Sequence, residues 1–180
     1  YFVTYEQVDP VFSVDLSDPE KPKILGKLKI PGFSEYLHFY GEDRLLGIGM
    51  STDEESGVAE GVKITMFHIT DRSDVKEEST LVLDDLYGSH AAYDYKSVLA
   101  DPEKNVIGLS GYSQNGESYY LLTYNRTDRK FETILQEEVN GNTSQGIRGI
   151  YIEDTLYVIS GNIIEAYDMN TGVKSGDIIL

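Results

Sequence analysis

Short apolar segments that end in a polar turn recur four times along this sequence. The last strand residues before these turns are Asp15, His68, Asn125 and Asp168, which are 53, 57 and 43 residues apart. A period of roughly 40 to 60 residues that contains four short strands is typical of repeated β-sheet units. The spacing therefore predicts a fold built from one sheet repeated along the chain.

A second landmark supports the same period. An acidic turn is followed by a more apolar strand at Leu45, Val106 and Leu156, which are 61 and 50 residues apart. The apolar runs are rich in β-branched and aromatic residues, and turn pairs such as Asn115-Gly116 separate them. Such Asn-Gly pairs favour tight hairpins, and no helical periodicity competes with them. We therefore expect an all-β chain.

The repeat predicts a β-propeller segment made of four-stranded antiparallel blades, about 3.75 blades in all, as one partial domain over residues 1–180. The predicted blades are 1–30 (without its first strand), 36–83, 95–139 and 147–180. In the third blade we expect the first strand at Tyr95–Ala100. A β-sandwich is the competing all-β fold, but a sandwich does not require a recurring unit of this length.

Composition excludes several classes of function. The chain has no Cys and no Trp, which excludes disulfide frameworks, thiolate catalysis and repeat families defined by a tryptophan. Thirty-one acidic and fifteen basic residues give a net charge of −16. An anionic surface repels phosphate backbones and anionic lipids, so we expect neither nucleic acid nor direct membrane insertion among the partners.

Several segments resemble one known family. They include Val14-Asp15-Leu16-Ser17-Asp18-Pro19 within residues 1–26, followed by Leu28–His38, Gly61–Phe67, Tyr93–Leu99, Asp101–Asn105 and Gly149–Ile152. They resemble secreted bacterial and archaeal proteins with a C-terminal β-propeller domain distantly related to WD40. In this family the turn after the third strand usually contains a proline, which His68-Ile69-Thr70-Asp71-Arg72 lacks. The resemblance implies a secreted or cell-envelope location, further blades in a longer protein and no established catalytic residue.

Residues suited to catalysis are present but are not assembled into a motif. Ser110 lies inside a predicted strand, without the spacing of a nucleophile elbow. His38, His68 and His90 occupy different repeats, without the short spacing typical of metal ligands. We therefore predict no catalytic residue, no metal site and no cofactor.

Two kinds of loop share one face of a propeller: those that join consecutive blades, and those that join the second and third strands of a blade. We expect the binding residues on these loops. The loops are Ser51–Gly61, Asp84–Asp94, Pro31–Glu35 and Asn140–Gly146. The second loop combines carboxylates with aromatic surface, which suits a cationic peptide, a carbohydrate or a weakly held cation. The candidate binding residues are Asp84, Asp85, Tyr87, His90 and Tyr93.

The leading hypothesis is a non-enzymatic extracellular or cell-surface module that binds a protein or carbohydrate ligand through this loop face. The alternative is a hydrolase or lyase with an acidic and histidine site near the propeller axis. Because open blade edges seek partners, we also expect self-association into a homo-oligomer.

Overall fold

The computed structural model describes residues 1–3, 10–29, 31–53, 55–139 and 146–180. Sixteen strands and two short 3-10 helices make up its regular structure, and the described residues contain no α-helix. None of the described helices has the length and apolar character needed to cross a membrane. The chain forms two compact units, Tyr1–Asp84 and Asp85–Leu180.

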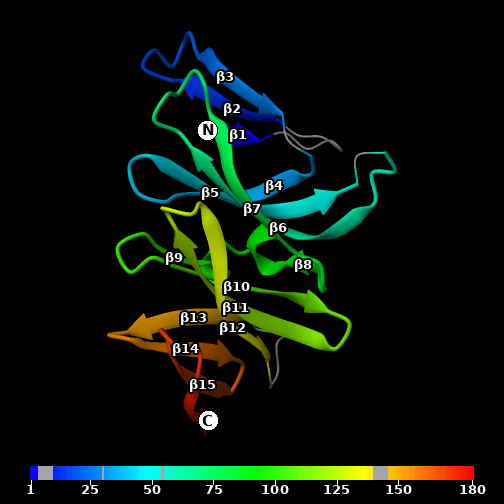
Figure 1. Cartoon of the computed structure of the whole chain (residues 1–180), viewed down its shortest axis with the longest axis vertical. Coiled ribbons are helices and arrows are strands. Elements are labelled where there is room, and N and C mark those ends of the chain that lie inside the picture. The colour runs from blue at the N-terminus through cyan, green and yellow to red at the C-terminus, as the bar shows by residue number, and fades with distance from the viewer. Residues whose placement is uncertain (4–9, 30, 54, 140–145) are drawn as a thin grey trace. The chain divides into compact units, whose positions relative to one another are not determined.

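The first unit contains two antiparallel sheets, drawn from blue to cyan-green in Figure 1. Sheet 1 has three strands, β1 (Phe2–Val3), β2 (Pro10–Asp15) and β3 (Lys23–Lys29). Sheet 2 has four, β4 (Phe33–Phe39), β5 (Arg44–Thr52), β6 (Ala59–His68) and β7 (Lys76–Leu83). Val11, Leu45, Phe67, Ile69 and Val75 form the buried apolar cluster of this unit. The expected strand Tyr1–Tyr5 lies partly outside the described residues.

The second unit contains two further antiparallel sheets, drawn from green to red in Figure 1. Sheet 3 contains β8 (Leu86–Ser89), β9 (Leu99–Asp101), β10 (Val106–Ser113), β11 (Gly116–Asn125) and β12 (Lys130–Glu138). Sheet 4 contains β13 (Ile147–Ile152), β14 (Thr155–Ser160), β15 (Ile163–Asp168) and β16 (Lys174–Ile179). Four separate sheets in sequence order confirm the predicted propeller segment and exclude a sandwich of two sheets.

The predicted turn landmark is confirmed in all four sheets. The strands β2, β6, β11 and β15 hold equivalent places in the four sheets. They end at Asp15, His68, Asn125 and Asp168, respectively. Three of these side chains accept hydrogen bonds from backbone N–H groups two or three residues later, which stabilises the following turn. His68 has no carboxylate or amide oxygen that could accept such bonds. In this turn Asp71 accepts them instead, from the N–H and the hydroxyl of Ser73.

Sheets 3 and 4 pack through a core built around Tyr119, which is completely buried. Its hydroxyl lies against the α-carbons of Gly108 and Gly149, where any side chain would overlap it. The core also contains Leu121, Leu156 and Tyr167. Burial raises the pKa of Tyr119 far above its ordinary value, so this phenol stays neutral.

The prediction for the start of sheet 3 is wrong. Residues 84–94 are not a single loop, because β8 forms a strand at Leu86–Ser89. Tyr95–Ala100 is not a strand, because Tyr95–Ser97 is the 3-10 helix η2 and β9 begins at Leu99. The other expected loops Ser51–Gly61 and Pro31–Glu35 are shorter than predicted because the flanking strands extend into them. The loop Asn140–Gly146 lies almost entirely outside the described residues.

Candidate functional site

The first strand of sheet 3 is interrupted. Its two parts both pair with β10, with Ser89 of β8 opposite Gly111 and Leu99 of β9 opposite Gly108. Residues 90–97 between them form η1 (His90–Ala92) and η2 (Tyr95–Ser97). We call residues 90–97 the 3-10 insertion. On this edge of β10, Leu109 and Ser110 therefore have no strand partner, whereas on the other edge they pair with β11.

Side chains replace the missing strand pairing at this interruption. The Ser89 hydroxyl donates to the carbonyl oxygen of Ser110 over 3.0 Å and accepts from the N–H of Ala91 over 3.1 Å. Asp94 accepts from the N–H of Lys96 over 3.0 Å, and the Ser97 hydroxyl donates to the Asp94 carbonyl over 2.7 Å. Each short helix therefore has its own N-terminal cap, which fixes the conformation of the insertion.

His90 anchors the insertion in the sheet below it. The ring is only 5% exposed, and its Nδ1 lies 2.9 Å from the Ser110 hydroxyl. Its Nε2 lies 3.2 Å from a carboxylate oxygen of Glu117 on β11. The Tyr112 and Tyr93 rings pack against the imidazole, with centroids 4.6 and 5.7 Å away. His90 thus joins the insertion to both β10 and β11.

The contacts among Ser110, His90 and Glu117 contain the residue types of a nucleophilic triad. However, the Ser110 side chain is completely buried, so a substrate cannot reach its hydroxyl without unfolding the site. Partial burial, followed by the Glu117 charge, raises the pKa of Tyr112 above its ordinary value and keeps this neighbouring phenol neutral. The arrangement is suited to holding the insertion and not to attacking a substrate.

Three exposed tyrosines lie on β8 and the insertion, within five residues of this buried anchor in the sequence. Tyr87 on β8 is 56% exposed, and Tyr93 and Tyr95 of the insertion are 66% and 67% exposed. We call these three residues the tyrosine surface. Other tyrosines of the chain are almost completely buried, namely Tyr40, Tyr119, Tyr120, Tyr124 and Tyr167. Exposed tyrosines on ordered backbone offer apolar ring faces and hydroxyls for contact with a ligand.

The structure brings together only part of the predicted binding set. Tyr87, His90 and Tyr93 belong to β8 and the insertion, with His90 buried and both tyrosines exposed. Asp85 accepts hydrogen bonds from the Tyr120 hydroxyl over 2.5 Å and from the Gln136 amide over 3.2 Å, so its carboxylate is held against β11 and β12. Asp84 is exposed at the end of the first unit.

Sequence reasoning missed Glu117, Tyr95 and Arg148, and it placed Ser110 correctly in a strand without its contact to His90. The contacts of Ser110 and Glu117 with His90 span 20 and 27 residues and leave no local signal. Tyr95 could have been found, because Tyr93-Asp94-Tyr95 places two aromatic residues around a helix cap. Arg148 of β13 lies 4.0 Å from Asp94, which places a cation beside the insertion.

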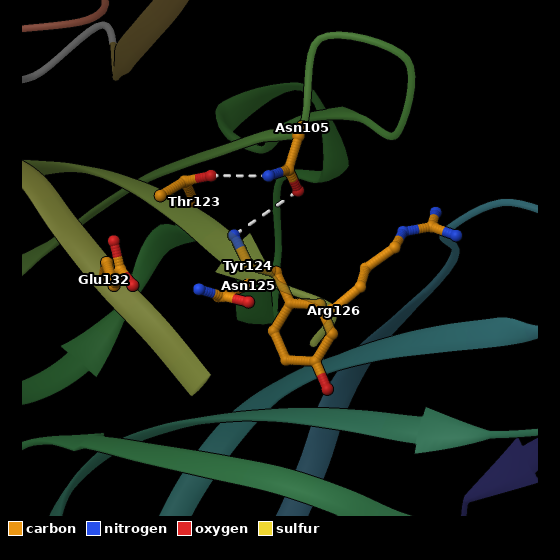
Figure 2. A pocket seen from close by; sticks show the side chains of 6 residues that line it. All are labelled: Asn105, Thr123, Tyr124, Asn125, Arg126 and Glu132. Carbon is orange, nitrogen blue, oxygen red and sulfur yellow. Dashed lines mark hydrogen bonds between the residues drawn. The ribbon is translucent and has the colours of Figure 1, made fainter. Parts of the chain in front are cut away.

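Two adjoining clefts lie elsewhere in the second unit, around the turn between β9 and β10, and Figure 2 shows the larger one. Their volumes are about 390 and 300 Å³, and both are lined by Asn105, Thr123 and Glu132. Asn105 has a φ of 55°, and its amide donates to the Thr123 hydroxyl over 2.6 Å (Figure 2). Within the described ranges, no group of three or more His, Asp or Glu side chains could hold a metal ion. The clefts are polar and contain no assembled catalytic group.

Repeated four-stranded antiparallel sheets, each followed by the next in sequence order, define this chain as a β-propeller protein. A family model described as the Beta propeller domain matches residues 1–172. The chain belongs to this Beta propeller domain family.

Two archaeal relatives are similar over almost the whole chain. An uncharacterized protein of Archaeoglobus fulgidus is 38% identical over 180 residues, which cover 100% of this chain and 26% of the relative. An uncharacterized protein of Methanocaldococcus jannaschii is 32% identical over 170 residues, or 94% of this chain and 25% of the relative. The chain therefore spans about a quarter of the length of these relatives.

Solved structures share the fold at low sequence identity. Saccharomyces cerevisiae Sqt1 superposes with a TM-score of 0.63 at 15% identity, over 98% of this chain and 43% of Sqt1. A 6-phosphogluconolactonase candidate from Bacteroides uniformis superposes with a TM-score of 0.61 at 14% identity, over 97% of this chain and 49% of its own. These similarities establish the architecture.

Proposed function

We propose that this propeller segment is a non-enzymatic binding module whose ligand contacts the tyrosine surface of sheet 3. The observation that carries the proposal is the exposure of Tyr87, Tyr93 and Tyr95 on β8 and the insertion, which the buried His90 anchors to β10. Tyrosine is among the residues that contribute most to binding energy at interfaces. Here it is presented on a backbone that is already ordered.

The rigidity of the insertion favours binding energetically. Ordering a loop on association costs free energy, which a preformed loop avoids. The caps at Ser89 and Asp94 and the buried Ser97 hold the insertion in one conformation before any ligand arrives. A tyrosine side chain also loses little conformational entropy when it is immobilised. Both effects leave more of the contact energy available for affinity.

Calorimetric titration with defined short peptides and oligosaccharides tests the proposal. For any ligand found, the double variant Tyr93→Ala with Tyr95→Ala should weaken binding by about tenfold or more, since stacking on each ring is lost. Phe39→Ala is the matched control, because Phe39 is an exposed aromatic residue on the first strand of sheet 2. Equal affinity of the double variant and the parent for every ligand would contradict the proposal.

The enzymatic alternative is less well supported. A hydrolase or lyase needs a nucleophile or base that reaches its substrate, whereas Ser110 and His90 are enclosed by Tyr93, Tyr112 and Glu117. Turnover of an ester, glycoside or polyuronate substrate that disappears in Ser110→Ala, while the variant stays folded by circular dichroism, would restore this alternative.

We propose that the module acts outside the cytoplasm, in a secreted or cell-envelope protein. Sequence resemblance to secreted propeller proteins supports this location. Protease treatment of intact cells that produce the full-length protein provides the test, since an external propeller is cleaved or released while a cytoplasmic control protein is protected.

We also propose that two copies associate through the face of sheet 4 that points away from sheet 3. Ile150 lies opposite Tyr157 on this face, and Ile159 lies opposite Ile164, so apolar side chains cover it. Because each copy carries a charge of −16, association should strengthen with ionic strength. Light scattering should show a dimer that Ile150→Lys with Ile159→Lys disrupts and that Ile24→Lys, an exposed control in β3, leaves intact.

A further inference from the structure

The smaller of the two clefts beside Asn105 is lined by both sheets of the second unit. Sheet 3 contributes the β9–β10 turn, β11 and β12, and sheet 4 contributes the turns that follow β13 and β15. Val106, Ile134 and Met169 supply its apolar lining, and all three belong to the core between the sheets or pack against it. A Cβ at Gly172 would overlap the carbonyl oxygen of Ile134, so the turn after β15 lies directly against β12. The cleft therefore has an apolar surface that is already packed in place.

Polar contacts join the residues of this cleft into one site. On sheet 3 the Asn105 amide donates to the Thr123 hydroxyl over 2.6 Å, and Thr123 lies opposite Glu132 in the pairing of β11 with β12. Between the sheets, Lys104 Nζ of sheet 3 lies 2.9 Å from a carboxylate oxygen of Asp154 of sheet 4. The walls of the cleft are thus tied to each other by contacts within this chain.

One negative charge of the cleft is uncompensated. Lys104 and Asp154 neutralise each other, and Glu132 is the second carboxylate of the lining. Among the residues that the structure describes, none forms a hydrogen bond or ion pair with the Glu132 side chain. Arg126 lines only the larger cleft, and Figure 2 shows its guanidinium directed away from Glu132. The smaller cleft therefore offers a free carboxylate beside an apolar surface.

We propose that this cleft binds the side chain of a lysine from a partner protein. The lysine ammonium donates to the Glu132 carboxylate and to the Thr123 hydroxyl oxygen. The four-carbon stem of the lysine lies against Val106, Ile134 and Met169, because amphipathic side chains bury their stem and keep the charge outside. This second binding site goes beyond the proposed function, since none of its lining residues belongs to the tyrosine surface.

Size and charge favour a lysine over other ligands. Sites for drug-sized ligands usually have volumes of about 300–1,000 Å³, and this cleft, at about 300 Å³, lies at the lower limit. Such a volume suits one inserted side chain, which is how a partner protein commonly anchors itself. An anionic side chain would be repelled by Glu132, whereas the overall charge of −16 favours the approach of a cationic partner.

NMR titration of the whole, isotopically labelled chain with short peptides tests this inference. The first probe is acetyl-Gly-Lys-Gly-amide, and the second has norleucine in place of lysine, which keeps the stem and removes the ammonium. The lysine peptide should shift the backbone amide signals of residues 104–106, 123 and 132–134, which line the cleft or adjoin it. The norleucine peptide should bind about two- to fivefold more weakly, as expected for the loss of one exposed ion pair. Affinity for the lysine peptide should fall as salt rises.

A third probe, n-butylamine, presents the same ammonium and stem without a polypeptide. It should bind more weakly than the lysine peptide, because the Asn170 amide of the lining then has no peptide group to contact. Equal or tighter binding of n-butylamine would overturn the assignment to a partner protein and identify a free amine as the ligand.

Two carboxylate variants on β12 separate this site from the charge of the whole chain. Glu132→Gln keeps the shape of the side chain and removes its charge, so the lysine peptide should bind about two- to fivefold more weakly. Glu138→Gln is the matched control, because Glu138 is exposed on the same strand but does not line the cleft, and the affinity should stay unchanged. The double variant Tyr93→Ala with Tyr95→Ala should also leave this binding unchanged. Circular dichroism shows whether each variant remains folded.

The remaining outcomes also decide the inference. Equal weakening by Glu132→Gln and Glu138→Gln would overturn it, because the peptide would then respond only to the overall charge. Equal binding of the lysine and norleucine peptides, or no shifts at the cleft, would exclude ammonium recognition there. Loss of binding in the tyrosine double variant would place the lysine on the tyrosine surface instead. The proposed function is decided separately, by its own panel of ligands.

Discussion

The first strands of sheets 2 and 3 begin the same four-stranded plan but are built differently. β4 is one strand that pairs with β5 from Phe33 to Phe39, with one irregularity between Ser34 and Tyr36. β8 and β9 pair with the two ends of β10, and the 3-10 insertion fills the interruption between them. Each strand region contains one histidine, His38 in β4 and His90 in the insertion.

The two histidines show what the interruption requires. His38 is half-buried and bonds to the Tyr36 hydroxyl, two residues away in the same strand, over 2.8 Å. Burial lowers the pKa of His38 below its ordinary value, so the ring is neutral at pH 7. His90 instead contacts Ser110 and Glu117 on two other strands. In β4 the backbone pairing holds the strand, and the His38 side chain bonds within its own strand. At the interruption the backbone pairing is absent, and the His90 side chain connects the insertion to the neighbouring strands.

The largest expected effect is that of His90→Ala, which removes a buried ring and leaves Ser110 and Glu117 without their partner. It should lower the free energy of unfolding by about 2–4 kcal/mol. His38→Ala should cost about 1 kcal/mol or less, because the ladder of β4 remains intact. Urea denaturation monitored by circular dichroism provides the comparison. Equal losses for the two variants would show that the histidines have equivalent structural roles.

Replacing a glycine by alanine adds a methyl group and so tests how closely two paired strands approach each other. Gly49 tests β5 against β4, and Gly88 tests β8 against β10. In Gly49→Ala the new Cβ would overlap the carbonyl of Phe33 on β4, so we expect a loss of about 1–3 kcal/mol. In Gly88→Ala the nearest atom is Cδ2 of Tyr112 at 3.6 Å, an ordinary contact, so the variant should be close to neutral. Thermal melts of the two variants measure this difference. A neutral Gly49→Ala would mean that β4 can shift away from β5.

The corresponding turns of sheets 2 and 3 should respond differently to acid, because only the turn of sheet 2 is held by a carboxylate. Hydrogen bonds from the Ser73 hydroxyl and N–H lower the pKa of Asp71 below 3.8 in the folded chain. The stabilisation by the Asp71 carboxylate is therefore present above pH 3.8 and is lost as pH falls through the lower, folded-state pKa. Asn125 makes the corresponding turn in sheet 3 without a titrating group.

The variant Asp71→Asn should therefore remove part of the acid sensitivity while it keeps a side-chain acceptor for the turn. Because Asp71 is fully exposed, the change in the urea midpoint between neutral and acidic pH should be small. Asn125→Asp is the reciprocal variant and should add acid sensitivity. Parallel pH profiles for parent and both variants would contradict this assignment.

The rings of the tyrosine surface should contribute little to stability. Tyr93 and Tyr95 are mostly exposed, so Tyr93→Ala with Tyr95→Ala should change the free energy of unfolding by about 1 kcal/mol or less. The same variant should have the largest effect on binding. A loss of stability as large as that of His90→Ala would show that the rings hold the insertion and are not reserved for a ligand.

Much of the fold follows from local sequence patterns. The residues Asp15, His68, Asn125 and Asp168 mark strand ends because turn chemistry is local, and an Asx residue caps its own turn. The first strand of sheet 3 could not be predicted in the same way. Leu86–Ser89 is only four residues long, and the insertion depends on contacts of His90 with distant strands. Hydrophobic periodicity carries no information about such contacts.

The candidate site was predictable in composition but not in arrangement. The aromatic and acidic character of residues 84–93 led to the binding prediction, and within this set Tyr87 and Tyr93 are exposed. His90 could not be assigned, because its burial depends on Tyr112 and Glu117. The pairing of Asp94 with Arg148 of β13 was equally hidden, since it arises only when sheets 3 and 4 pack together.

The bond from the Ser89 hydroxyl to the Ser110 carbonyl closes the interrupted edge of β10 before the insertion turns outwards. The pairing of β8 with β10 therefore does not depend on the exposed residues of the insertion. We expect these exposed residues to tolerate changes in sequence. A fixed frame with an exchangeable segment is the arrangement from which new specificities evolve. The same position offers protein engineers a place to graft recognition sequences between Ala91 and Lys96 while Ser89, His90, Asp94 and Ser97 are kept.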